Sequence, residues 1–274
     1  MLGLAYQRIL QRTESIVYAA DHEQIDVASS NAPQVIASFR PDIIIHCAAY
    51  TSVDRAETER DRCFMVNVDG SRNVAKAAAR CGALLIYNQT FLTLKHGTKP
   101  QSEISVRGPL SHYAATKLQG EMAVASEWSK VLTVCKGGLF GGVERDKNFV
   151  GKIISHLRSQ KPGAKVNIGN RVWQPTWTED IASWTTRLAF ANFTGTFNLA
   201  SGGSASFYDT ASFIASHLKI PVEITEVDWR TVASREIAQR PECVLLNCQK
   251  AEQTLGLKIP TWQERLVVYL DAFK

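Results

Sequence analysis

Short apolar runs alternate with helix-like segments through the first half of the chain, and this alternation constrains the fold more than any other feature. Each run is almost entirely apolar, which is typical of strands buried on both faces of a sheet. Strands that alternate with helices form βαβ units around a parallel sheet. We therefore expect an α/β fold with a doubly wound parallel sheet. The predicted strands cover residues 15–20, 42–47, 83–87 and 131–135.

Helices are predicted between these strands. Residues 32–39 form one of them. Residues 63–80 form a longer one, in which Val66 and Val74 recur at helical spacing and Gly82 follows as a stop signal. Beyond the predicted sheet the pattern is less regular, with short strands and helices such as those expected at residues 196–199 and 208–218.

Composition narrows the range of partners. The 274 residues include 31 Lys and Arg against 26 Asp and Glu, a formal net charge of +5 at pH 7 without a basic run, which argues against nucleic acid. No stretch approaches the ~18 apolar residues of a membrane-spanning helix, so we expect no membrane partner and a cytoplasmic location. The six cysteines form no CxxC pair, which predicts free buried thiols and no metal site.

Tyr113 and Lys117 form a YxxxK spacing in a segment that looks helical, which places both side chains on one face, one turn apart. A phenol can protonate a carbonyl oxygen while hydride arrives at the carbonyl carbon, and a nearby ammonium lowers the phenol pKa and can hold ribose hydroxyls. Thr90 lies 23 residues before Tyr113, after a predicted strand, and its hydroxyl could polarise the same carbonyl. The spacing alone also occurs by chance on solvated helix faces.

The residues around this spacing resemble one family in order along nearly the whole chain, from about residue 2 to the C-terminus. Residues 48–57 (AAYTSVDRAE) closely match the AAYTxVDxAE signature of the dTDP-4-dehydrorhamnose reductase family. Residues 67–70 (NVDG) and 117–121 (KLQGE) resemble that family's asparagine-bearing helix and its KLxGE run. Further matches to its nFv, xPT and RPxxSxLd segments lie at residues 148–150, 174–176 and 240–247.

The resemblance implies an extended short-chain dehydrogenase/reductase. Residues 1–145 would form a Rossmann-like dinucleotide-binding part, and residues 146–274 mainly a smaller substrate-binding lobe packed with it as one unit. The implied reaction is reduction of a 4-keto-6-deoxy nucleotide sugar in dTDP-rhamnose or polysaccharide biosynthesis, with NADP(H) or NAD(H) as cofactor. A homodimer is compatible with it. The implied catalytic residues are Thr90, Tyr113 and Lys117.

The resemblance places further residues near the ligands. Ala48, Ala49 and Tyr50 follow a strand at the carboxyl edge of the sheet, where a dinucleotide lies, although a tight loop chosen for packing is the alternative. Asp26 and Val27 match a pair near the adenosine end, although an aspartate also commonly opens a turn. The other implied cofactor-binding residues are Gly3, Asn67, Tyr113 and Lys117. The implied substrate-binding residues are Thr51, Val53, Asp54, Trp173, Gln174 and Thr176, of which the tryptophan also suits packing within the lobe.

The front of the chain departs from a dinucleotide-binding fold, which opens with a strand and a GxxGxxG turn whose amides approach the pyrophosphate. Here Leu2 and Gly3 resemble only the last two positions of that turn, and a helix-like segment follows to Leu10. We therefore expect a sheet without its first strand, and weak cofactor binding. Two explanations stay open: a start at an internal methionine or a shortened chain, and a natural divergent member.

Two segments near the expected site also depart from the family. Its STDYVF stretch reads QTFLTL at residues 89–94, and its RTSWVYG segment reads CKGGLFG at residues 135–141, so polar groups are lost and Lys136 replaces an arginine. An alternative function is therefore a non-catalytic relative that binds a partner protein or a nucleotide sugar, since the regulatory subunit of methionine adenosyltransferase resembles this family. A nucleotide-sugar epimerase or dehydratase is a third, although no further acid/base pair requires it.

Overall fold

A parallel sheet of four strands forms the centre of the computed structural model, which describes residues 1–142, 146–234 and 236–273. The strand order is β1-β2-β4-β9, and every neighbouring pair is parallel. This confirms the α/β class and four of the five predicted strands. The bounds are Ile43–His46 for β1, Leu84–Thr90 for β2, Val131–Lys136 for β4 and Gly195–Leu199 for β9.

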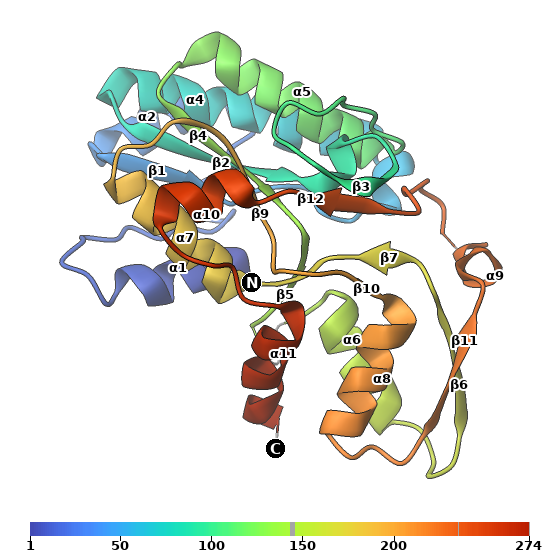
Figure 1. The fold of residues 1–274 in the computed structure, drawn as a ribbon. Coiled ribbons are helices and arrows are strands. Elements are labelled where there is room, and N and C mark those ends of the chain that lie inside the picture. The colour runs from blue at the N-terminus through green and yellow to red at the C-terminus, as the bar shows by residue number, and fades with distance from the viewer. Residues whose placement is uncertain (143–145, 235, 274) are drawn as a thin grey trace.

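Helices cover both faces of this sheet, as a doubly wound fold requires (Figure 1). Leu85 and Tyr87 point from β2 toward one helical layer, and Leu84 and Ile86 point toward the other. The first layer holds α2 (Ala32–Ser38), α4 (Gly70–Cys81) and α5 (His112–Glu127). The second holds α1 (Leu2–Leu10), α7 (Thr178–Phe190) and α10 (Gln249–Leu255).

The long helix predicted at residues 63–80 is present but interrupted. It runs through α3 (Arg60–Phe64), a single π-helical segment (Met65–Asp69) and α4. It ends at Gly82, whose φ of 69° is a left-handed conformation that glycine adopts without a steric penalty. The π-helical segment contains Asn67, and such segments frequently occur at functional sites.

A second hydrophobic core lies beyond the sheet and is formed by the C-terminal part of the chain. It packs α6 (Phe149–Arg158), α8 (Phe207–His217) and α11 (Trp262–Leu270) around the parallel pair of β6 (Lys165–Gly169) and β11 (Glu223–Val227). The expected division of the chain at residue 145 falls on residues outside those that the structure describes. The shorter elements are β3 (Gly97–Gln101), β5 (Gly138–Phe140), β7 (Val172–Trp173), β8 (Pro175–Trp177), β10 (Ala205–Ser206), α9 (Trp229–Ala233) and β12 (Val244–Leu246).

The strand predicted at residues 15–20 is wrong. These residues form no regular element and are all exposed, Ile16 to 84% and Tyr18 to 70%. Among the described strands, β1 pairs only with β2, so its other edge has no ladder to which residues 15–20 could connect. An apolar run becomes a strand only when a neighbour satisfies its backbone groups. Within the described residues, β1 is therefore the edge strand on this side of the sheet.

None of the described helices combines the length and apolar character needed to cross a membrane.

Candidate active site

The YxxxK residues and Thr90 meet at the carboxyl edge of the sheet. Thr90 is the last residue of β2, and Tyr113 and Lys117 lie in the first two turns of α5. That helix begins where the Ser111 hydroxyl accepts a 3.2 Å hydrogen bond from the amide of Ala114. Both Tyr113 and Lys117 are buried. The predicted trio is thus placed on two adjacent elements that pack directly on one another.

Gly120 brings α5 unusually close to the rest of the sheet layer. A Cβ at this position would lie 2.2 Å from the carbonyl oxygen of Asn67 and 2.7 Å from the hydroxyl of Tyr87. The close approach lets the Tyr87 hydroxyl donate a 2.9 Å hydrogen bond to the carbonyl of Lys117. The glycine of the KLQGE run therefore permits this close packing, which sets the distance between Lys117 and the sheet.

The pKa of the Lys117 side chain is lowered toward neutral pH. It lies 4.3 Å from the centroid of the Tyr87 ring, where a cation is attracted to the aromatic face. Burial, followed by the nearby ammonium of Lys136, lowers the pKa of Lys117 to about 7. The side chain can therefore exchange a proton near neutral pH.

The phenol of Tyr113 does not have the lowered pKa that the spacing suggested. Burial raises its pKa to about 12, and a hydrogen bond with the Thr90 hydroxyl only partly opposes this effect. Burial dominates because the phenol has little contact with water. Tyr113 is therefore held protonated, the state that a proton donor requires.

Thr90 is oriented by its own turn. Its Oγ1 accepts a 3.3 Å hydrogen bond from the amide of Leu92, and its carbonyl accepts a 2.9 Å bond from the hydroxyl of Thr93. An oxygen that already accepts a bond still carries its hydroxyl hydrogen. The Thr90 hydroxyl can therefore donate to a carbonyl oxygen placed beside Tyr113.

Asn67 holds the loop that follows β1. Its Oδ1 accepts a 2.9 Å hydrogen bond from the amide of Tyr50, and its Nδ2 donates to the Tyr50 carbonyl at 3.3 Å and to the Thr116 hydroxyl at 3.1 Å. The side chain is buried and fully used by these partners. Ala48, which is exposed, and Ala49 therefore sit at the carboxyl edge in a fixed loop.

The remaining expected cofactor residues, Gly3, Asp26 and Val27, lie in the N-terminal part of the chain. Gly3 lies in the first turn of α1, where a Cβ would be 3.8 Å from the Cβ of Cys47. Asp26 caps a turn, since its Oδ1 accepts a 3.0 Å bond from the amide of Ala28. Val27 packs against Gly70, where a Cβ would come within 2.7 Å of its Cγ2 atom.

Asp54 joins the sheet layer to the segment before β12. Its carboxylate pairs with the Arg240 guanidinium through bonds of 3.0 and 2.7 Å and accepts from the amides of Ile237 and Ala238 at 3.1 and 3.0 Å. These contacts lower the pKa of Asp54 to about 2, with the Arg240 hydrogen bond as the largest cause. Of its expected neighbours in substrate binding, Thr51 is exposed and Val53 is half-buried.

Residues 173–176 are anchored inside the protein. The Trp173 indole packs against Phe149 and Phe207 and donates a 3.1 Å bond to Thr210, so its ring belongs to the core of the lobe. The Gln174 Oε1 accepts a 2.6 Å bond from the amide of Leu246. The Thr176 hydroxyl donates to the Gln174 carbonyl at 3.1 Å. These side chains fix the loop rather than project from it.

Three further polar residues reach the same edge. The sequence placed Lys136 only in a segment near the expected site, and it assigned no role there to His46 or Cys47. Lys136 ends β4 and donates to the carbonyl of Gln89 at 2.8 Å, and burial lowers its pKa to about 8. His46 ends β1, contacts the Ser71 hydroxyl at 3.1 Å, and has a pKa lowered to about 3 by burial and then by Lys117. Cys47 follows it. The signal was available, because each lies where a predicted strand ends.

The residues present suit the nicotinamide and ribose end of a dinucleotide. Lys117 forms no ion pair among the residues that the structure describes and so offers free ammonium donors, and Tyr113 offers a protonated phenol. Ala48 is exposed and Ala49 is half-buried, and both place small side chains at this carboxyl edge. At the pyrophosphate end, Gly3 and the first turn of α1 supply only part of the backbone amides that a GxxGxxG turn would offer. No group of three metal-ligating side chains occurs in the described ranges.

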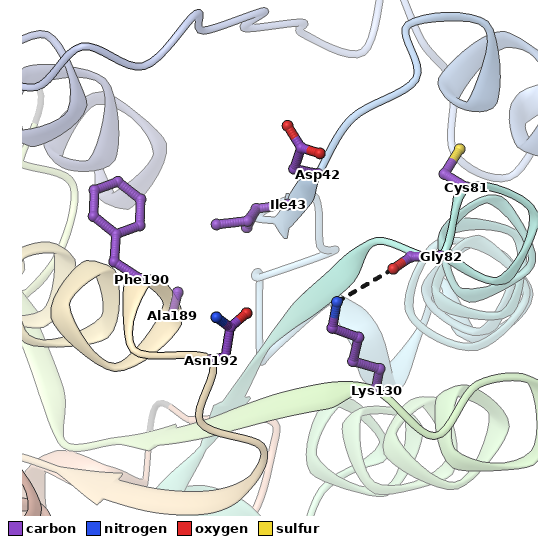
Figure 2. A pocket seen from close by; sticks show the side chains of 8 residues that line it. All are labelled: Asp42, Ile43, Cys81, Gly82, Lys130, Ala189, Phe190 and Asn192. Atoms are coloured by element: carbon purple, nitrogen blue, oxygen red, sulfur yellow. Dashed lines mark hydrogen bonds between the residues drawn. The ribbon is translucent and has the colours of Figure 1, made fainter.

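A separate depression of about 550 Å³ lies at the opposite edge of the sheet (Figure 2). Asp42 and Lys130 precede β1 and β4, and Gly82 precedes β2, so its lining comes from the amino ends of the strands. Lys130 reaches the carbonyl of Gly82 at 3.4 Å. Ligands of open α/β sheets bind at the carboxyl ends, and this depression is therefore not the candidate active site.

The doubly wound sheet and the Thr90, Tyr113 and Lys117 arrangement define a protein of the short-chain dehydrogenase/reductase class. The chain belongs to the RmlD substrate binding domain family, whose model matches residues 1–274.

Individual relatives and structures agree with this assignment. The dTDP-4-dehydrorhamnose reductase of Sinorhizobium fredii is 32% identical over 250 residues, which cover 86% of this chain and 81% of that protein. The methionine adenosyltransferase 2 subunit beta of Bos taurus is 31% identical over 247 residues, covering 86% and 71%. The crystal structure of dTDP-4-dehydrorhamnose reductase from Bacillus anthracis in complex with NADP has a TM-score of 0.90 and 30% identity, covering 99% of this chain and 95% of that one.

Proposed function

We propose that the chain is a reductase of a 4-keto-6-deoxy nucleotide sugar that uses NADP(H) or NAD(H), similar to dTDP-4-dehydrorhamnose reductase in dTDP-rhamnose or polysaccharide biosynthesis. The observation that carries the proposal is the meeting of Thr90, Tyr113 and Lys117 at the carboxyl edge of the parallel sheet. Similarity to reductases over most of the chain supports it.

Each residue of the trio has a distinct role. The Tyr113 hydroxyl gives its proton to the keto oxygen of the sugar, and the Thr90 hydroxyl donates a hydrogen bond to the same oxygen. Lys117 holds ribose hydroxyls and returns the phenol to its protonated state, because its own pKa lies near neutral. A reduced nicotinamide, when bound, supplies the hydride that the carbonyl carbon accepts.

The surrounding residues are assigned to the two ligands as the resemblance implies. Backbone and small side chains line the cofactor, and the loops between the sheet and the lobe contact the sugar. We infer a cytoplasmic enzyme, and a homodimer is compatible with this function. The proposed cofactor residues are Gly3, Asp26, Val27, Ala48, Ala49, Tyr50 and Asn67. The proposed substrate residues are Thr51, Val53 and Asp54, and Trp173, Gln174 and Thr176 are proposed to fix the neighbouring loop from inside the protein.

A second candidate function is binding of a partner protein without catalysis. Two observations favour it: the similarity to a subunit of methionine adenosyltransferase 2 over 86% of this chain, and the replacement of the family's serine and hydroxyl residues by Gln89, Gly137 and Gly138. Retention of all three catalytic side chains favours the reductase.

Turnover separates the two candidates. The purified chain is incubated with NADPH or NADH and a dTDP-4-keto-6-deoxy sugar, and loss of the reduced nicotinamide is followed by its absorbance. A reductase consumes cofactor in proportion to the sugar added. A folded chain that binds the cofactor but leaves it unoxidised would refute the reductase function and support partner binding.

A further inference from the structure

Gln89 is a fully buried side chain that touches both elements of the proposed catalytic machinery. Its Oε1 accepts a 2.9 Å hydrogen bond from the amide of Thr90. Its Nε2 donates to the carbonyl of Lys117 at 3.1 Å and to Oε2 of Glu121 at 2.7 Å. One amide group therefore joins the end of β2 to the turn of α5 that carries the lysine.

The contacts of Gln89 continue into a closed circuit. The second carboxylate oxygen of Glu121 accepts a 3.3 Å bond from the Arg107 guanidinium, which also donates to the Thr93 hydroxyl at 3.0 Å. That hydroxyl donates to the carbonyl of Thr90 at 2.9 Å. Both the amide and the carbonyl of Thr90 are thus held by one continuous network of polar groups.

A third element supports the same point. The Lys136 ammonium at the end of β4 donates to the carbonyl of Gln89 at 2.8 Å. Buried networks of this kind are rigid when every member is satisfied, and they lose order when one member is removed. The main chain of Gln89 is therefore held by β4, and the side chain of Gln89 is held by α5.

We propose that Gln89, held by Glu121, is a positioning residue that sets the Thr90 hydroxyl against Tyr113 and Lys117. The proposal rests on the reductase function. The family that this chain resembles has a serine at this position, which is too short to span from the Thr90 amide to α5. The bridge that Gln89 forms between the Thr90 amide, the Lys117 carbonyl and Glu121, called the clamp below, is therefore a feature of this chain. Small displacements of a hydrogen-bond donor lower the rate of a reaction much more than they weaken binding.

Gln89→Met tests the clamp, because methionine keeps the length of the side chain and removes its donor and acceptor. We expect kcat to fall about 10- to 100-fold while KM for the sugar and Kd for the cofactor stay within about twofold. Asn198→Leu is the matched control. Asn198 is a buried amide that bridges the carbonyls of Gln101 and Asn247 at 2.9 and 3.2 Å, and its loss should lower stability with kcat retained.

An exchange of the two partners gives an independent readout. Gln89→Glu places a second carboxylate against Glu121, so we expect a larger loss of kcat than in the methionine variant. Gln89→Glu combined with Glu121→Gln restores the hydrogen bond with donor and acceptor exchanged, and should recover about tenfold of that loss. Equal kcat in the single and double variants, or wild-type kcat in Gln89→Met, would overturn the proposal.

Turnover by the unaltered chain tests the reductase function separately from the clamp. If the unaltered chain is inactive, hydrogen exchange of the Thr90 amide tests whether the clamp holds this residue. The clamp predicts slow exchange in the unaltered chain and in Asn198→Leu, and exchange at least about tenfold faster in Gln89→Met. The same exchange rate in all three proteins contradicts the clamp, whatever the chain catalyses.

Discussion

The hydroxyl of Tyr87 donates a 2.9 Å hydrogen bond to the main-chain carbonyl of Lys117, whose ammonium lies 4.3 Å from the centre of the same ring. One aromatic side chain of β2 thus contacts both ends of the lysine. Because that ring is buried in the sheet layer, the position of the ammonium is set by the strand as well as by α5. The position of the Lys117 ammonium therefore depends on the packing of α5 against β2.

Tyr113→Phe should abolish reduction and leave cofactor binding nearly unchanged. The substitution removes only the hydroxyl that donates the proton, so the loss falls on kcat, by about 10²- to 10⁴-fold. Turnover assays and calorimetric titration of the cofactor measure the two effects on the same preparation. A variant with unchanged kcat would remove Tyr113 from the mechanism.

Gly120→Ala should destabilise the chain by about 1–3 kcal/mol. The added methyl would come within 2.2 Å of the Asn67 carbonyl oxygen, so α5 must move away from its neighbours. Gly3→Ala is the control, since it also lies in a helix and its Cβ would meet no atom closer than 3.8 Å. Unfolding by urea measures both. Equal stability of the two variants would show that α5 does not depend on this close contact.

Buried lysines should make the chain more stable as the pH rises above neutral. The folded-state pKa is about 7 for Lys117 and about 8 for Lys136, against an ordinary value of 10.5, so the unfolded chain binds more protons above pH 7 and the free energy of unfolding rises with pH. The free energy of unfolding is measured at about pH 7 and at about pH 8.5. Both values lie below the ordinary cysteine pKa of 9.0, above which the raised pKa of buried thiols lowers the stability as the pH rises.

Lysine substitutions test whether Lys117 and Lys136 cause this rise of the unfolding free energy with pH. Replacing both residues, Lys117→Met with Lys136→Met, should flatten the dependence of the unfolding free energy on pH in this window. Lys165→Met, which removes an exposed lysine paired with Glu223, should leave it unchanged. An undiminished slope in the double variant would assign the effect to other groups.

Asp54→Asn should weaken sugar binding more than it weakens the fold. The asparagine loses the charge that pairs with Arg240, and a partly exposed pair of this kind contributes about 1 kcal/mol or less. The segment at residues 236–240 is then held less firmly, so KM for the sugar should rise with little change in kcat. Because the pKa of Asp54 is about 2, the pair should persist at neutral pH and be lost only as the pH falls toward that value.

Local patterns predicted much of the fold. Continuous apolar runs marked β1, β2 and β4, and the YxxxK spacing placed Tyr113 and Lys117 on one buried helix face. Residues 15–20 have the same apolar character, yet they form no strand, because strand formation depends on a neighbouring ladder that a local pattern does not report.

The site was predictable in its residue types and less so in its charge states. Thr90 follows a strand and could be placed at the carboxyl edge. The opposite pKa shifts of Tyr113 and Lys117 depend on how deeply α5 is buried and on Lys136, which is distant in sequence. The Gln89 clamp likewise joins residues up to 32 positions apart, and it reads in the sequence only as a departure from the family pattern.

Calorimetric titration of the unaltered chain with NADPH and with NADH tests the central claim most directly, because the proposed reduction requires cofactor at this edge of the sheet. The account predicts saturable binding of one of them at a single site, weakened about tenfold or more by Lys117→Met. A folded chain that binds neither cofactor, or that binds one equally well without the Lys117 ammonium, would contradict it.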